Sequence, residues 1–242
     1  HTSGIDSDVI GDLSKDESEI KTVTEVLKKR ILPVVRKPGQ FIEYSNYGVA
    51  LAGAAIENAS GMTCADYINK RIFLPLGMTQ TSFNMSSQQL AKGYVSIGGK
   101  NVEKELKGYF NLYPVGGVIS TAEDMSNFMI AHLNNGEYQG TSILKKDTLE
   151  KMHARQSGFD LRLPGTCYGF YERFIGDQRT IEHAGYSPDG FSTELCLLTD
   201  YKLGIFISVN QGSNNSFPQD FIIDFIKHYF LNDNNAEKTD FK

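Results

Sequence analysis

The chain has 242 residues, of which 40% are hydrophobic and 22% charged, and its formal net charge is −5. This composition supports a packed core and excludes wholesale disorder, while the acidic balance argues against a nucleic-acid binder. The longest apolar run is far below the roughly 20 residues that cross a bilayer, so we expect no transmembrane segment. Cys64, Cys167 and Cys196 form neither a CxxC zinc motif nor the pattern of a disulfide scaffold.

The first 160 residues carry mainly helical signals. Apolar spacing predicts a helix over Glu19–Ile31. Phe41–Tyr44 is expected to be extended, and the small residues of Tyr47–Ala59 predict a buried helix that ends at Ser60-Gly61. Residues 80–112 are expected to be loop-rich and polar. Further helices are predicted over about Thr63–Ile72, from a capping box at Ser120–Glu123 to about His132, and over Leu144–His153.

The pattern changes after residue 165. Short connections between consecutive strands imply antiparallel pairing, and a last amphipathic helix follows Ser216–Gln219. We therefore predict an α+β fold: residues 5–160 as a mostly helical subdomain, residues 161–231 as an antiparallel sheet with a covering helix, and residues 232–242 as a flexible tail. The predicted strands are Tyr168–Phe174, Arg179–Ala184, Phe191–Leu198 and Leu203–Val209.

One candidate site segment is Tyr44-Ser45-Asn46, just before the buried helix. The positive end of the helix dipole would favour an ionised phenol, so Tyr44 could act as a general base near neutral pH. Asn46 lies two residues on and offers both a donor and an acceptor. The alternative is that Ser45 or Asn46 caps the helix and Tyr44 is a core residue.

A second candidate segment is His183-Ala-Gly185, at the end of a strand. Gly185 would leave room for another backbone or a ligand. The alternative is a surface histidine before a hairpin turn. The other histidines are expected to be structural. His132 and His228 lie on predicted helices with no partner at metal-ligand spacing, and His153 ends a helix, where a cation suits the dipole.

Five stretches together resemble a known family: His1–Gly4, Pro38–Gly48, Pro75–Met78, Gly116–Asp124 and His183–Phe191. In this order they are similar to the serine β-lactamase and penicillin-binding-protein family, in its class C-like branch. That branch also contains D-alanyl-D-alanine carboxypeptidases, D-aminopeptidases and esterases. The resemblance implies a β-lactamase/transpeptidase-like fold, a small-molecule or peptide substrate and an extracytoplasmic location. It implies no metal and no organic cofactor.

The family combines three motifs in its active site: Ser-x-x-Lys, Tyr-x-Asn, and Lys-Thr-Gly or His-x-Gly. The resemblance assigns Tyr44 and Asn46 to the second motif, and His183 and Gly185 to the third. His183 would then contact the substrate. The resemblance also implies that the backbone N–H of Tyr186 is an oxyanion donor. The His-x-Gly form favours a peptidase or esterase over a dedicated β-lactamase.

The first motif is not found at its expected place. In the family, Ser-x-x-Lys precedes the stretch that His1–Gly4 resembles. The two such sequences of this chain, Ser18–Lys21 and Ser142–Lys145, both follow that stretch, so neither is expected to supply the nucleophile. We therefore expect the C-terminal portion of a serine hydrolase that forms an acyl-enzyme. The alternatives are a non-catalytic pseudoenzyme or sensor and a fragment whose missing segment is supplied separately.

The last predicted strand, Leu203–Val209, is almost continuously apolar, which is typical of a strand paired on both edges. Its obvious neighbour is Phe191–Leu198 alone. In the family this strand is flanked by strands that precede Ser-x-x-Lys. We therefore expect its open edge to be covered by something outside the 242 residues: a separate N-terminal fragment, a second copy or a swapped element.

Overall fold

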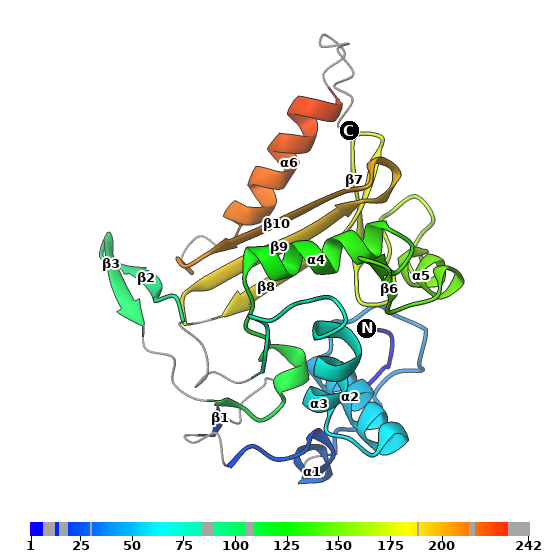
Figure 1. Ribbon diagram of the computed structural model, residues 1–242, viewed down its shortest axis with the longest axis vertical. Helices are drawn as coiled ribbons and strands as arrows, with labels where there is room; N and C mark the ends of the chain where they lie inside the picture. Colours follow the sequence, from blue (N-terminus) through cyan, green and yellow to red (C-terminus); the bar gives the residue numbers. More distant parts are fainter. Residues whose placement is uncertain are drawn as a thin grey trace.

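The computed structural model describes residues 1–6, 13–14, 19–29, 31–83, 90–104, 109–187, 189–212 and 216–231. The expected tail, residues 232–242, and Ser18 lie outside these ranges. The described residues form helices and antiparallel strands, so the predicted α+β class is confirmed (Figure 1). The helices are α1 (Val23–Lys29), α2 (Asn46–Ser60), α3 (Cys64–Ile68), α4 (Ala122–Leu133), α5 (Lys146–His153) and α6 (Phe217–Phe230).

The main sheet has the strand order β10-β9-β8-β7, and every neighbouring pair is antiparallel. Three smaller strand pairs lie elsewhere among the described residues, and the hairpin of β2 and β3 lies within residues 80–112, which the sequence predicts to be loop-rich. The strands of the main sheet are β7 (Tyr171–Ile175), β8 (Gln178–Ser187), β9 (Phe191–Leu198) and β10 (Leu203–Val209). The smaller pairs are β1 (Leu13–Ser14) with β4 (Tyr109–Phe110), β2 (Gly93–Ile97) with β3 (Lys100–Lys104), and β5 (Glu137–Tyr138) with β6 (Thr141–Ser142).

The boundaries of β9 and β10 are as predicted, while others shift for local reasons. Helix α1 begins only at Val23, because Thr22 and Glu25 form a capping box through their side chains and backbone N–H groups. Helix α4 is capped by Thr121, whose hydroxyl accepts from the N–H of Asp124, and the predicted cap Ser120 is one residue too early.

Other elements also differ from their predicted ranges. Strand β8 runs from Gln178 to Ser187, beyond the predicted Arg179–Ala184. The expected helix Thr63–Ile72 is α3 followed by a π-helical turn, Asn69–Phe73. The expected helix Leu144–His153 begins at Lys146 as α5. Strand β7 starts at Tyr171 because a turn precedes it, in which Gly169 has a φ of 80°.

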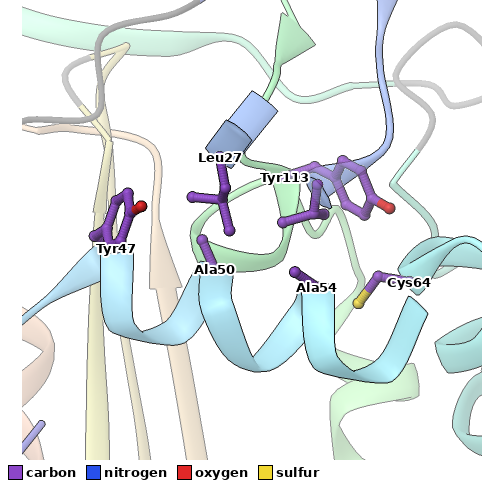
Figure 2. Close-up of a cluster of buried hydrophobic side chains, with 7 residues drawn as sticks. Leu27, Tyr47, Ala50, Ala54, Cys64 and Tyr113 are labelled. Atoms are coloured by element: carbon purple, nitrogen blue, oxygen red, sulfur yellow. The ribbon is translucent and has the colours of Figure 1, made fainter. Parts of the chain in front are cut away.

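Helix α2 is the centre of the helical core, and it packs closely because its residues are small. Ala50 is fully buried, and Leu27 of α1 lies against it together with Tyr47 (Figure 2). The Cβ that Gly53 lacks would come within 3.1 Å of the Pro114 ring. The helix ends as predicted, with Gly61 in the left-handed region.

A buried carboxylate joins three segments of this core. Glu57 of α2 accepts the N–H groups of Val23 and Thr24 at the start of α1, at 3.1 and 2.9 Å, and the Thr24 hydroxyl at 2.7 Å. It also accepts the N–H of Cys64 at the start of α3, at 3.3 Å, and Tyr113 donates from 3.4 Å. One side chain thus satisfies orphan donors of two helix N-termini.

The main sheet is covered by a different helix on each face (Figure 1). Met129 of α4 packs with Ile181 and Leu195 on one face. Ile222 and Ile226 of α6 pack on the other face. Among the described strands, β10 is paired on one edge only, as expected from the sequence.

Candidate functional site

The Tyr44 segment lies at the start of α2. Ser45 is the N-cap, buried, and its hydroxyl accepts the N–H of Gly48 at 3.0 Å. Asn46 is the first residue of the helix and is half-buried. Tyr44 is 45% exposed. The structure therefore supports the capping role of Ser45 but not the placement of Tyr44 in the core.

His183 of β8 lies beside this helix start, so the structure brings the two predicted segments together. The ring centroids of Tyr44 and His183 are 6.4 Å apart. Two further rings lie between them. The ring centroid of His1 is 4.3 Å from that of Tyr44 and 5.8 Å from that of Tyr171, and the Tyr171 centroid is 5.9 Å from that of His183. The His1 ring is fixed because its Nδ1 accepts the N–H of Ser45 at 3.1 Å. We refer to these four rings as the aromatic cluster.

The reasoning from sequence missed Tyr171, and His1 was noticed only as part of a longer motif. Tyr171 opens a short edge strand, and nothing in the local pattern of that strand distinguishes it from a surface tyrosine. Only the tertiary fold places its ring beside that of His183. Burial raises the pKa of Tyr171 to about 12, with a contribution from the neighbouring Tyr44.

Burial also raises the pKa of Tyr44 above its ordinary value of 10. This is the opposite of the expectation that the start of the helix favours the phenolate. The half-buried position of the phenol penalises its anion. For Tyr44 to act as a base near neutral pH, a cation must therefore lie beside it.

Next to the aromatic cluster, strand β8 extends beyond the start of its neighbour β7. The N–H of Glu172 donates to Gly165, so Glu172 of β7 turns its backbone away from β8. The backbone N–H and C=O groups of successive residues point to alternate edges of a strand. Those of Glu182 therefore point to β7, and those of Ala184 and Tyr186 point to the same side. The register of β7 with β8 reaches no further than Tyr171↔Glu182. The backbone of Tyr186 therefore points to the stretch of this edge beyond the start of β7.

Gly185 has a close neighbour, but of a different kind from the one predicted. It pairs with Thr193 of β9, and an added Cβ would lie 2.3 Å from the Thr193 hydroxyl. A side chain of the adjacent strand occupies the space that glycine leaves. The Nδ1 of His183 lies 2.7 Å from the carbonyl of Ala184 on the open edge.

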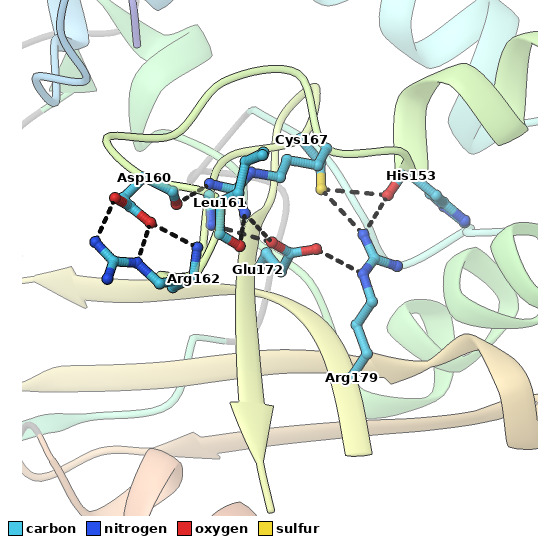
Figure 3. Close-up of polar contacts among 9 residues, drawn as sticks. His153, Asp160, Leu161, Arg162, Cys167, Glu172 and Arg179 are labelled. Atoms are coloured by element: carbon cyan, nitrogen blue, oxygen red, sulfur yellow. Dashed lines mark hydrogen bonds and ion pairs between the residues drawn. The ribbon is translucent and has the colours of Figure 1, made fainter. Parts of the chain in front are cut away.

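His132 and His153, which the sequence predicts to be structural, contact each other. His132 Nδ1 lies 2.9 Å from His153 Nε2, and His132 is 4% exposed. Around them, Arg179 donates to Glu172 at 2.7 Å and to the carbonyl of His153 at 2.8 Å, and Cys167 donates to the same carbonyl (Figure 3). Both histidines have pKa values below the ordinary value, mainly because of burial.

A cavity of about 490 Å³ lies next to this histidine pair, and none of the four rings of the aromatic cluster lines it. Within the described residues, no group of three or more His, Cys, Asp or Glu side chains is placed to hold a metal ion. No described helix is long and apolar enough to cross a membrane.

The second Ser-x-x-Lys sequence does not have the geometry of a catalytic pair. Ser142 belongs to the short strand β6, and its hydroxyl donates to the carbonyl of Leu144 at 2.9 Å. Lys145 is the N-cap residue of α5, which begins at Lys146. Ser142 and Lys145 therefore do not face each other across one helical turn.

Comparison with known proteins agrees with this fold. The chain is 30% identical over 222 residues to "Beta-lactamase-like protein 2" of Dictyostelium discoideum, covering 86% of this chain and 38% of that protein. It is 27% identical over 219 residues to "Protein flp" of Staphylococcus aureus, covering 88% and 42%. The chain therefore spans about two fifths of the length of these curated relatives.

Solved structures show the same fold at lower identity. An octameric penicillin-binding protein homologue from Pyrococcus abyssi has a TM-score of 0.73 at 24% identity, covering 87% of this chain and 48% of that chain. A D-amino acid amidase from Ochrobactrum anthropi has a TM-score of 0.68 at 20% identity, covering 94% and 70%. The family model "Beta-lactamase" matches residues 1–225. The chain belongs to the β-lactamase family.

Proposed function

We propose that the chain is the C-terminal portion of a serine hydrolase that acts through an acyl-enzyme on peptide, ester or β-lactam carbonyls. The observation that carries this proposal is the meeting of Tyr44, at the start of α2, with His183, on the open edge of β8. These residues come from segments 139 positions apart, and they match two motifs of one active site. The nucleophilic serine and its lysine would come from polypeptide outside these 242 residues.

Each residue has a stated role in this proposal. Tyr44 is the general base once the ammonium of the missing lysine lies beside it and lowers its pKa. Asn46 orients that lysine and the substrate. His183 contacts the carboxylate or another polar end of the substrate. The N–H of Tyr186, directed to the open edge of β8, is one oxyanion donor, and the N–H of the nucleophile is the other.

A second candidate function is a non-catalytic protein that keeps the cleft as a binding or sensor site. The observation in its favour is that Ser142 and Lys145 do not form a catalytic pair in the structure. The sequence of the encoded protein upstream of His1 discriminates the two candidates. A Ser-x-x-Lys there supports the hydrolase, and its absence supports the non-catalytic protein.

Covalent labelling tests the proposal directly. The complete encoded protein should form one adduct with a fluorescent penicillin or a fluorophosphonate, read by intact mass and mapped to a serine outside these residues. Residues 1–242 alone should form none, because loss of the nucleophile has cost about a million-fold in turnover in another serine hydrolase. A stoichiometric adduct on Ser18 or Ser142 would show that the assignment is wrong.

Tyr44→Phe in the complete protein tests the base. Turnover should fall by about 10²–10⁴-fold, the usual contribution of a general base. The free energy of unfolding should change little, because Tyr44 is half-exposed and only a hydroxyl is removed. Tyr186→Phe is the matched control, since only the backbone of Tyr186 has a role in the proposal. Full turnover in Tyr44→Phe would remove Tyr44 from the mechanism.

A further inference from the structure

His1 holds the segment around Tyr44 by contacts on both sides of that residue. The His1 carbonyl accepts the N–H of Glu43 at 2.9 Å, and its ring Nδ1 accepts the N–H of Ser45 at 3.1 Å. Tyr44 lies between these two donors in the chain, and its ring centroid is 4.3 Å from that of His1. One residue therefore contacts the backbone before Tyr44, the backbone after it and the phenol ring itself.

The backbone of the His1 stretch is fixed independently of the His1 ring. The N–H of Gly39 donates to the carbonyl of Thr2 at 2.8 Å, and the N–H of Arg36 donates to that of Gly4 at 3.1 Å. Gly4 has a φ of 69°, which favours glycine, and an added Cβ would lie 2.2 Å from the Arg36 carbonyl oxygen. Because these bonds join backbone groups, a change of the His1 side chain leaves them in place.

The phenol of Tyr44 depends on its neighbours for its orientation. Tyr44 is 45% exposed, and the described residues form no hydrogen bond with its hydroxyl. The His1 ring is closer to it than the His183 ring, whose centroid is 6.4 Å away. The residue that follows, Ser45, caps α2 in an extended conformation with φ −139° and ψ 109°. The direction in which Tyr44 leaves the helix start is therefore set at the residue whose N–H binds His1.

The hydrogen bond to Ser45 also fixes the form of the imidazole. A ring nitrogen that accepts a hydrogen bond carries no proton, so the neutral His1 ring has its proton on Nε2. A doubly protonated ring would turn Nδ1–H against the Ser45 N–H, and the bond would be lost. The ring that lies beside Tyr44 is thus neutral, and the cation that a tyrosine base requires comes from another residue.

We propose that His1 is a positioning residue for Tyr44, acting through the ring contact and through the N–H of Ser45. This inference rests on the proposed function, because it requires Tyr44 to be the general base. In this role His1 touches neither the substrate nor the nucleophile. Its loss should lower kcat and leave KM nearly unchanged, because a misplaced base slows the chemical step without weakening substrate binding.

Three variants of the complete protein separate the two contacts. His1→Phe keeps a ring beside Tyr44 but accepts no hydrogen bond, whereas His1→Asn keeps an acceptor near the place of Nδ1 but has no ring. Each should lower kcat by about tenfold, and His1→Ala, which loses both contacts, by about a hundredfold. Ser3→Ala is the matched control: it removes a side-chain hydrogen bond to Ile5 in the same stretch and should leave kcat unchanged.

Combination with Tyr44→Phe decides whether His1 acts through Tyr44. In that background His1→Ala should cause no further loss of kcat, because the base is already absent. A further hundredfold loss would give His1 a role of its own and overturn the proposal, as would full kcat in His1→Ala alone. Full kcat in Tyr44→Phe alone would instead refute the proposed function, and with it the need for a positioning residue.

Hydrogen exchange gives a readout that does not require catalysis. By NMR, the N–H of Ser45 should exchange at least about tenfold faster in His1→Phe and His1→Ala than in wild type, and at the wild-type rate in His1→Asn. Unchanged exchange in His1→Phe would show that the bond to Ser45 does not hold this segment, and would overturn the proposal. Circular dichroism verifies the fold of each variant. If His1→Ala does not fold, His1→Phe takes its place in the combination with Tyr44→Phe.

Discussion

The helical part and the sheet each bury a glutamate, and the two are partnered very differently. Glu57 is 8% exposed and accepts hydrogen bonds from the starts of α1 and α3. Burial opposes its ionisation, but bonds from Thr24, Val23 and Cys64 outweigh burial and lower its pKa. Glu194 is buried at least as well, yet one of its oxygens is unbonded among the described residues and its pKa is raised.

This difference shows which of the two buried carboxylates obtains its donors from the described residues. Around Glu57, every segment that contributes a donor comes from the helical part. Around Glu194, one carboxylate oxygen has no donor among the described residues, and the neighbouring strand β10 is paired with described strands on one edge only. The aromatic cluster lies where these two parts meet. The proposed site therefore combines a helix start from the part that surrounds Glu57 with a strand of the sheet that contains Glu194.

The strongest test of this contrast is to remove the same charge from both glutamates. Glu57→Gln should lower the free energy of unfolding by about 3 kcal/mol, since it weakens bonds to a charged group and turns an NH₂ toward helix N–H donors. Glu194→Gln should change it by less than about 1 kcal/mol, because no described donor loses its acceptor at Oε1. Urea unfolding of both variants at pH 8 measures this. Equal losses would break the comparison.

The contrast between these glutamates could not be predicted from the sequence, although much of the fold could. Strands β9 and β10 have the predicted ends because apolar runs stop at the turn that contains Asp200. Helix α2 is recognisable from its small residues and from Gly61. Glu57, by contrast, binds donors 33 and 34 residues away in the chain, and a local pattern does not contain that information.

In the candidate site, too, some residues are predictable from a local sequence motif and others only from the tertiary fold. Tyr44 and His183 were found because each lies in a short motif, and the fold brings them together. Tyr171 belongs to no such motif, and its place in the aromatic cluster depends on how β7 pairs with β8. The contact between His132 and His153 likewise joins α4 and α5 through two residues 21 positions apart in the chain.

That histidine pair gives a second test, at the contact between α4, α5 and the sheet. Burial lowers the pKa of His132 to about 3, and the charge of His153 adds to this effect. An unfolded histidine titrates near pH 6.5, so below that pH the unfolded chain binds the extra proton and the folded chain loses stability. The stabilisation is complete above pH 6.5 and is lost progressively as the pH falls towards 3.

For His132 alone, the free energy of unfolding should be about 2 kcal/mol lower at pH 5 than at pH 7.5. Urea titrations at the two pH values measure the difference. His132→Phe should flatten this dependence, because the substituted ring is apolar and packs among Phe128 and Phe170. His228→Gln, on the exposed side of α6, should leave it unchanged. An unchanged slope in His132→Phe would mean that other groups titrate.

The smallest expected effect concerns Gly185, and it separates packing from ligand access. Gly185→Ala should cost about 1 kcal/mol, since the new methyl meets the Thr193 hydroxyl at 2.3 Å. Thr193→Ala in the same chain should restore stability, whereas Thr193→Val should not, because valine keeps a γ atom there. Thermal unfolding of the three variants decides whether the sheet alone requires glycine. If the rescued double variant of the complete protein folds normally but no longer acylates, glycine is also required by a bound substrate. If it acylates normally, the strand pairing with Thr193 is sufficient reason for glycine at this position.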